Sequence, residues 1–156
     1  MKIPDSERGA HMEQSYEEIM YRVNCLASDL DALYHQAALK LGLSDSVLFV
    51  LYLVYEKGGR RPLAAICKEA NISKQTLNSA VRKLEGERIV YLEQSGGRAK
   101  TLCLTEAGMD YARRTVARLF RAERSVFRDW TPEEIRQYLR LMEKYNNDFR
   151  RQIETM

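Results

Sequence analysis

The chain has 156 residues, of which 45% are hydrophobic and 30% charged, and its formal net charge at pH 7 is +3. This length suits one domain with additional helices, and the composition excludes the fibrous and disordered classes of protein. The longest apolar run, residues 47–55, is far shorter than the roughly 20 residues that a membrane-crossing helix needs. The sequence therefore predicts a soluble protein that forms one unit and has no membrane partner.

Few cysteines and histidines are present, which limits the chemistry that the chain can carry. Cys25, Cys67 and Cys103 lie far apart and form no Cys-x-x-Cys pair, so we expect free thiols and a cytoplasmic location. Residues 1–11 have the pattern of a cloning leader, and excluding them leaves His35 as the remaining histidine. A histidine-based metal site or catalytic triad then lacks its residues. We expect no enzyme activity, no metal site and no cofactor.

Basic residues concentrate in the middle of the chain. Residues 12–56 hold two basic and seven acidic residues, whereas residues 57–100 hold ten basic and four acidic ones. From residue 101 to the end the numbers are eleven and nine. Localised positive charge is typical of a nucleic-acid-binding module, so the middle third is the candidate for contacts with DNA.

The first half of the chain is predicted to form four helices. Apolar residues recur at helical spacing over residues 16–41, and the apolar run over residues 47–55 predicts a buried helix. A short third helix is expected over residues 62–70 and a fourth over residues 73–86. The residues that mark the ends of these helices are Gly42, Ser44, Pro62, Ser73 and Gly86.

The second half adds a hairpin and two longer helices. Strand-like runs over residues 89–94 and 100–104, joined by a glycine-containing loop, predict a β-hairpin with a basic tip. Thr105 is placed to cap a helix over residues 106–128, and residues 131–134 form a capping box for the last helix. The predicted fold class is mainly α with a small β-hairpin.

The third and fourth helices form a candidate helix-turn-helix in the most basic segment. If the apolar positions of the fourth helix face the core, amide, hydroxyl and arginine side chains face outward, and these can read base edges. Flanking residues can hold phosphates. The residues expected to contact DNA are Ser73, Lys74, Gln75, Thr76, Asn78, Ser79, Arg82 and Lys83. The alternative is a solvated surface helix.

Several of these motifs together resemble the MarR (multiple antibiotic resistance regulator) family. They are residues 63–64 and 71–76, Val81-Arg82-Lys83-Leu84-Glu85, Arg98, and Leu102-Cys103-Leu104-Thr105-Glu106-Ala107-Gly108. The Leu-Thr-x-x-Gly sequence after a wing arginine is the more specific part, whereas many regulators share the helix-turn-helix. The resemblance covers nearly all of residues 12–156. It implies a winged helix-turn-helix, a dimer built from the terminal helices, and transcriptional regulation released by a ligand or an oxidant.

The resemblance also implies how the chain is divided. Residues 12–44 would be an N-terminal dimerisation helix, residues 45–108 the winged helix-turn-helix DNA-binding domain, and residues 109–156 the C-terminal dimerisation helices. In the family the wing arginine enters the minor groove, and Arg98 matches it, with Lys100 beside it. An arginine on a glycine-flanked tip can also reach a narrow groove on physical grounds. A disordered loop is the alternative.

Two positions depart from the family pattern. Gly96 stands where an aspartate usually precedes the wing arginine. Arg88 stands where a glycine commonly follows the recognition helix, and we expect Gly86 to end the helix instead.

A small-molecule effector is the next implication, with a pocket between the dimerisation and DNA-binding regions. The candidates to line it are Tyr34, His35, Phe49 and Tyr52, although aromatics at helical spacing are more often core. Cys25 lies opposite the apolar stripe of its helix and is expected to be exposed, so a thiol-based redox sensor is an alternative. The family's peroxide-sensing cysteine matches a position near Met20, not Cys25. Glu123 falls on an apolar helix side and is expected to pair across a dimer.

The favoured interpretation is a homodimeric, sequence-specific repressor that binds a pseudo-palindromic, double-stranded DNA operator and responds to a small molecule. The homodimer is predicted from the amphipathic first and last helices, the latter carrying Tyr138, Leu141, Met142, Tyr145 and Phe149. The other interpretation is a winged-helix module for protein–protein interaction. It predicts an apolar outward side on residues 73–85.

Overall fold

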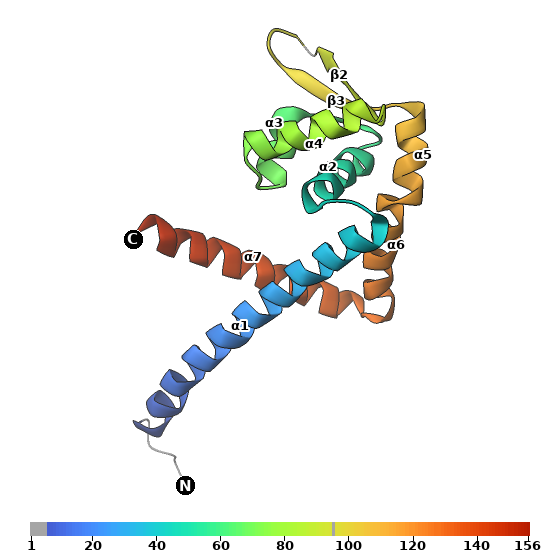
Figure 1. Ribbon diagram of the computed structural model, residues 1–156. Helices are drawn as coiled ribbons and strands as arrows, with labels where there is room; N and C mark the ends of the chain where they lie inside the picture. Colours follow the sequence, from blue (N-terminus) through green and yellow to red (C-terminus); the bar gives the residue numbers. More distant parts are fainter. Residues whose placement is uncertain (1–5, 95) are drawn as a thin grey trace.

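The computed structural model describes residues 6–94 and 96–156, with side chains from Ser15 onward. The chain is mainly helical with a small antiparallel sheet, which confirms the predicted fold class (Figure 1). The first helix begins earlier than predicted, and residues 1–5 of the expected leader lie outside the described residues. In chain order the elements are α1 (Ser6–Leu41), α2 (Asp45–Glu56), β1 (Arg60–Pro62), α3 (Leu63–Glu69), α4 (Lys74–Gly86), β2 (Val90–Gln94), β3 (Lys100–Leu104), α5 (Glu106–Arg114), α6 (Val116–Val126), the 3-10 turn η1 (Phe127–Asp129) and α7 (Pro132–Glu154).

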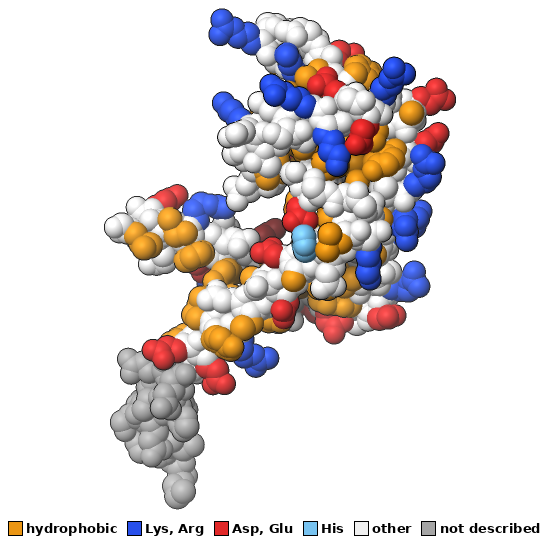
Figure 2. Space-filling model, viewed as in Figure 1, with side chains coloured by type: hydrophobic (Ala, Val, Ile, Leu, Met, Phe, Trp, Pro, Cys, Tyr) orange, Lys and Arg blue, Asp and Glu red, His pale blue; other side chains and the backbone are white. Residues whose placement is uncertain are grey.

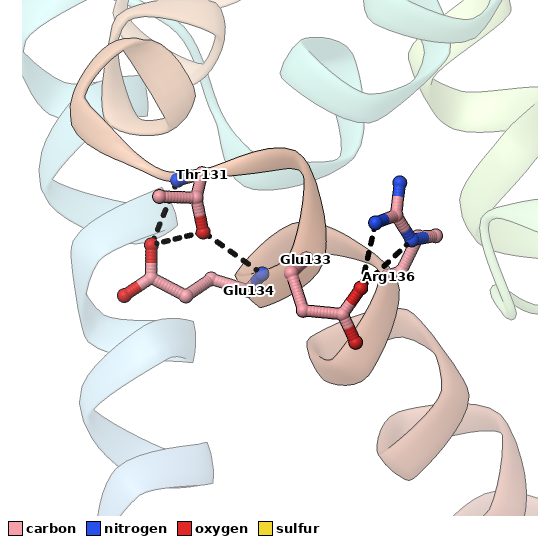
Figure 3. Close-up of polar contacts among 4 residues, drawn as sticks. All are labelled: Thr131, Glu133, Glu134 and Arg136. Carbon is pink, nitrogen blue, oxygen red and sulfur yellow. Dashed lines mark hydrogen bonds and ion pairs between the residues drawn. The ribbon is translucent and has the colours of Figure 1, made fainter.

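Four helices begin at the capping residues that the sequence indicates. Ser44, Ser73 and Thr105 each accept a hydrogen bond from the backbone N–H three residues later, at 3.4, 3.0 and 2.8 Å. At the start of α7, Thr131 and Glu134 bond each other's backbone in a reciprocal capping box (Figure 3). Each cap satisfies backbone donors that the first helical turn leaves without an intrahelical partner. These starts are therefore set by local sequence.

The core lies around α2, which packs against α4, α5 and α6. Its apolar run places five residues in the interior: Val47, Leu48, Val50, Leu51 and Val54. The predicted inward positions of α4 are also all buried: Leu77, Ala80, Val81 and Leu84. Because the two helices bury these stripes against each other, the opposite side of α4 is turned to solvent.

The sheet has the strand order β1-β3-β2, and both pairings are antiparallel. Strands β2 and β3 are the predicted hairpin, with Val90 opposite Leu104. Strand β1 was not predicted, because the three residues Arg-Arg-Pro show neither alternation nor β-branched side chains. It pairs Arg60 with Cys103 and so attaches the connection between α2 and α3 to the hairpin.

The prediction of one long helix over residues 106–128 was wrong, because the chain forms α5 and α6 with a break at Thr115. The backbone there has φ −113° and ψ −93°, outside the helical region, and Thr115 Oγ1 donates to the Tyr111 carbonyl at 2.8 Å. A threonine hydroxyl that bonds a carbonyl four residues earlier competes with the helical pattern and often bends helices.

The end of α4 also differs from expectation. Gly86 is still helical, and Arg88 takes the left-handed conformation with φ 58° that a glycine usually supplies at this position. The N–H of Arg88 donates to the Glu85 carbonyl and that of Ile89 to the Leu84 carbonyl, each at 2.9 Å. This is a Schellman ending, in which Arg88, and not Gly86, is the left-handed residue that ends the helix.

The Leu-Thr-x-x-Gly sequence after β3 has a packing reason. The N–H of Thr105 donates to the Ile89 carbonyl at 3.0 Å. One turn later, Gly108 lies so close to the same carbonyl that a Cβ at this position would sit 1.8 Å from its oxygen. A side chain at Gly108 would therefore push α5 away from the start of β2.

Helices α1 and α7 extend away from the rest of the molecule and carry apolar side chains to solvent (Figures 1 and 2). Leu26 and Leu33 of α1 are 65% and 59% exposed, and Leu141 and Phe149 of α7 are 47% and 51% exposed. No residue of α7 is buried. Among the described residues no single helix is long and apolar enough to cross a membrane, and α1 from Ser15 passes such a test only jointly with α2 across an 88° bend.

Candidate DNA interface and neighbouring cavity

Helix α4 turns its predicted outward side to solvent. Every candidate side chain on it is exposed: Ser73, Lys74, Gln75, Thr76, Asn78, Ser79, Arg82 and Lys83. The hydroxyls of Ser73 and Thr76 lie 2.9 Å apart, so these two residues also serve the start of the helix. Amide, hydroxyl and guanidinium groups on one helix side can bind both base edges and phosphates.

The loop of the wing turns at two glycines. Gly96 and Gly97 have φ 96° and 57°, and Gln94 Nε2 donates to the Gly97 carbonyl at 2.7 Å. A left-handed backbone at Gly96 disfavours any residue with a Cβ, which accounts for the absence of the usual aspartate. Arg98 and Lys100 follow the turn and are exposed.

The wing and α4 share one surface. A hollow of about 310 Å³ lies between them, and its walls include Lys74 and Asn78 of α4 together with Arg98 and Lys100 of the wing. In Figure 1 the hairpin stands beside α3 and α4 at one end of the molecule, and Figure 2 shows Lys and Arg side chains at this end. The DNA-contact residues predicted on α4 and those predicted on the wing therefore lie on the same surface.

Two arginines of the basic segment form ion pairs with residues of the same chain. Arg60 forms an ion pair with Glu93 of β2, and Arg61 forms one with Glu69 at the end of α3. The Arg61 side chain is 9% exposed, and its Nε has no hydrogen-bond partner among the described residues. These pairs connect β1 to the wing and to α3. No sequence pattern indicated them, because they depend on how β1 pairs.

A cavity of about 210 Å³ lies among α1, α2, the end of α3 and α6. Three of the four predicted pocket residues, Tyr34, Phe49 and Tyr52, line it. His35 does not: its Nδ1 lies 3.0 Å from both carboxylate oxygens of Asp45, on the exposed surface. Consecutive helical residues point about 100° apart, which is why Tyr34 and His35 do not face the same space.

Glu123 of α6 does not need a second chain for its partners, contrary to expectation. The hydroxyl of Tyr34 donates to Oε1 and that of Tyr52 to Oε2, both at 2.6 Å. Burial, followed by these bonds to the carboxylate, raises the pKa of Tyr34 to about 12, and the pKa of Tyr52 is raised for the same reasons. One carboxylate thus connects α1, α2 and α6.

The cysteines occupy three different environments. Cys25 is exposed on α1, as predicted, and Cys103 is buried. Cys67 is half-buried, and its Sγ donates to the Ile72 carbonyl at 3.2 Å. No group of three or more metal-binding side chains occurs within the described part of the chain.

Residues 41–100, from the end of α1 to the start of β3, match the sequence model of the MarR family. No curated protein matches the sequence. A MarR family regulator from Neisseria meningitidis has a similar structure, with a TM-score of 0.73 at 19% identity over 90% of this chain and 96% of that one.

Two further solved structures were obtained with bound partners. MepR of S. aureus, in complex with DNA, gives a TM-score of 0.63 at 16% identity over 83% of this chain and 96% of that one. NadR, in complex with 4-hydroxyphenylacetate, gives 0.65 at 15% identity over 81% of this chain and 91% of that one. At these identities the likeness establishes the fold. The helix-turn-helix segment of this chain thus matches the MarR family, and the chain shares the fold of MarR family structures over most of its length.

Proposed function

We propose that this protein is a homodimeric, cytoplasmic repressor that binds a pseudo-palindromic operator and releases it when a small molecule occupies the cavity beside Glu123. The observation that carries the proposal is the convergence of the polar side of α4 and the basic wing on one surface. The DNA bound by MepR and the 4-hydroxyphenylacetate bound by NadR support the two kinds of partner.

In this proposal α4 enters the major groove. Gln75 and Asn78 suit adenine, and Arg82 suits the two acceptors of guanine. The lysines Lys74 and Lys83 lie beside them and suit phosphates, which position a protein without reading sequence. Ser73, Thr76 and Ser79 complete the contact surface.

The wing enters the adjacent minor groove. Arg98 stands just beyond the glycine turn and is exposed, so its guanidinium can reach a narrow groove with strong negative potential. Lys100 begins β3 and adds a charge next to the backbone phosphates.

The homodimer is proposed from the exposed apolar sides of α1 and α7. A 23-residue helix that buries none of its residues in its own chain, yet carries exposed leucine and aromatic side chains, is typical of an interface. Within this proposal residues 12–44 and 109–156 dimerise, and residues 45–108 bind DNA. Val116 of α6 also packs into the core of the DNA-binding part.

Effector control is proposed to act through Glu123. This carboxylate holds Tyr34 of the dimerisation helix and Tyr52 of the DNA-binding part, so a ligand that alters either bond changes how α2 sits against α1 and α6. In a dimer such a shift changes the spacing of the two α4 helices, which must match successive major grooves about one helical turn apart.

The test is the selection of bound sequences from a random DNA pool by the full chain. A pseudo-palindrome with half-site centres roughly 10 bp apart should be enriched. A pool without enrichment would contradict the proposal, and an asymmetric single site would contradict the dimer. The interaction-module alternative has no support in the exposed side of α4, which is polar at each candidate position.

A further inference from the structure

The cavity among α1, α2 and α6 combines aromatic walls with negative charge. Tyr34, Phe49 and Tyr52 line it with aliphatic side chains, and Glu69 contributes a carboxylate at the end of α3. Glu123 does not line the cavity, but its carboxylate accepts hydrogen bonds from the hydroxyls of Tyr34 and Tyr52, which do.

Of the two carboxylates, Glu69 has a basic partner and Glu123 has none among the described residues. None of the residues that line the cavity is a lysine, an arginine or a histidine. Within the described part of the chain no basic side chain forms an ion pair with Glu123. Arg61 pairs with Glu69 itself and so balances one of the two carboxylates, whereas His35 pairs with Asp45 on the exposed surface. The arginines on the same helix as Glu123, namely Arg118, Arg121 and Arg124, are exposed.

The aromatic rings are held in place by neighbours. Tyr52 stacks on Phe120 with ring centroids 4.3 Å apart, and Tyr34 lies 5.8 Å from Phe49. Ring faces attract cations, and the attraction grows when water is excluded. An anionic ligand would instead lie near the charge of Glu123, with no lysine or arginine in the cavity wall to pair with the ligand.

We propose that this cavity binds an organic cation with a compact apolar body, such as a quaternary ammonium attached to one aromatic ring. The inference rests on the proposed function and specifies the chemical class of the effector. A cation of this kind is stabilised by the ring faces and by the charge of Glu123. The bound cation attracts the Glu123 carboxylate and so weakens the hydrogen bonds that this carboxylate accepts from Tyr34 and Tyr52. The Glu123 carboxylate then both attracts the effector and, when the effector binds, loosens its connection among α1, α2 and α6.

The test compares probes of equal ring size and different charge on the full-length protein. Isothermal titration calorimetry with benzyltrimethylammonium, phenylacetate and benzyl alcohol should rank the cation first, with roughly tenfold tighter binding than the anion. Equal or tighter binding of phenylacetate would overturn the inference, as would the absence of binding by the cation. This comparison needs no variant and does not depend on how a substitution affects folding.

A pair of variants then tests whether the charge of Glu123 is needed for cation binding. Glu123→Gln keeps an oxygen acceptor and removes the charge, and it should weaken cation binding roughly tenfold. Glu154→Gln removes the same charge at the exposed end of α7 and should leave cation binding unchanged. An unchanged dissociation constant in Glu123→Gln would overturn the inference. Operator affinity is measured on the same preparations: a chain that binds its operator but prefers phenylacetate disproves the ligand class alone, whereas a chain that selects no operator disproves the proposed function.

Discussion

Arg82 and Arg98 are both exposed arginines, but Arg82 lies on a helix and Arg98 lies in a loop. Arg82 projects from a rigid helix whose other side is buried, whereas Arg98 follows a glycine turn at the end of a hairpin. A rigid support suits a two-point contact with one base, and a projecting loop suits a groove whose width varies with sequence. The two side chains are therefore expected to contribute to binding in different ways.

Substitution of these arginines should separate the two contributions. Arg82→Ala should cost about 1–3 kcal/mol of operator binding and relax specificity at one base pair. Arg98→Ala should weaken binding more evenly across sequences and lower the slope of log affinity against log salt by about 1. Fluorescence anisotropy over a salt series checks both. Arg140→Ala, on the polar side of α7, removes the same charge and should leave affinity unchanged; equal losses in all three variants would point to net charge alone.

Tyr34 provides a pH-dependent test of the connection through Glu123. Its pKa is raised from 10.0 to about 12, so folding favours the protonated phenol. This contribution to stability is complete below pH 10 and is lost as the pH rises through 12. The difference in ultraviolet phenolate absorbance between wild type and Tyr34→Phe should titrate near 12, and Glu123→Gln should move it toward 10. A difference curve centred near 10 in the wild type would contradict the geometry.

At the scale of elements, the junction between the wing and α5 depends on a close approach. Gly108 leaves room for the Ile89 carbonyl, whereas a Cβ at Gly86, at the end of α4, would contact no neighbouring element. Gly108→Ala should lower the free energy of unfolding by about 1–3 kcal/mol or more. Gly86→Ala, in an open helical position, should be neutral or stabilising by about 0.5–1 kcal/mol. Urea unfolding checks the pair, and equal stability of the two variants would refute the packing argument.

Local sequence was sufficient where local bonds set the structure. The helix starts at Ser44, Ser73 and Thr105 and the outward side of α4 followed from caps and periodicity. Strand β1 could not be predicted from local sequence, because it depends on pairing with β3. The break at Thr115 could not be predicted either, because it interrupts a continuous helical pattern of apolar residues. The partners of Glu123 within the chain did not follow from the sequence either, because they require three helices to be packed together.

For the whole molecule, the exposed sides of α1 and α7 predict dimerisation. Leu141→Glu places a charge on the apolar side of α7 and should convert the dimer into a monomer with unchanged helix content, because burying an unpaired carboxylate is costly. Light scattering at micromolar concentration and circular dichroism check the two parts of this prediction. Arg140→Glu, on the polar side of the same helix, should remain dimeric. A wild-type monomer at this concentration would contradict the homodimer directly.

In the proposed dimer, two copies of α4 and of the wing bind one operator together. DNase footprinting of the full chain on its selected operator measures this most directly. Two protected half-sites centred roughly 10 bp apart should appear at the same protein concentration, with two chains bound per duplex. Both should weaken steeply with added salt because phosphate contacts release counterions. Protection that is absent, confined to a single half-site, or insensitive to salt would contradict joint binding of one operator by two chains.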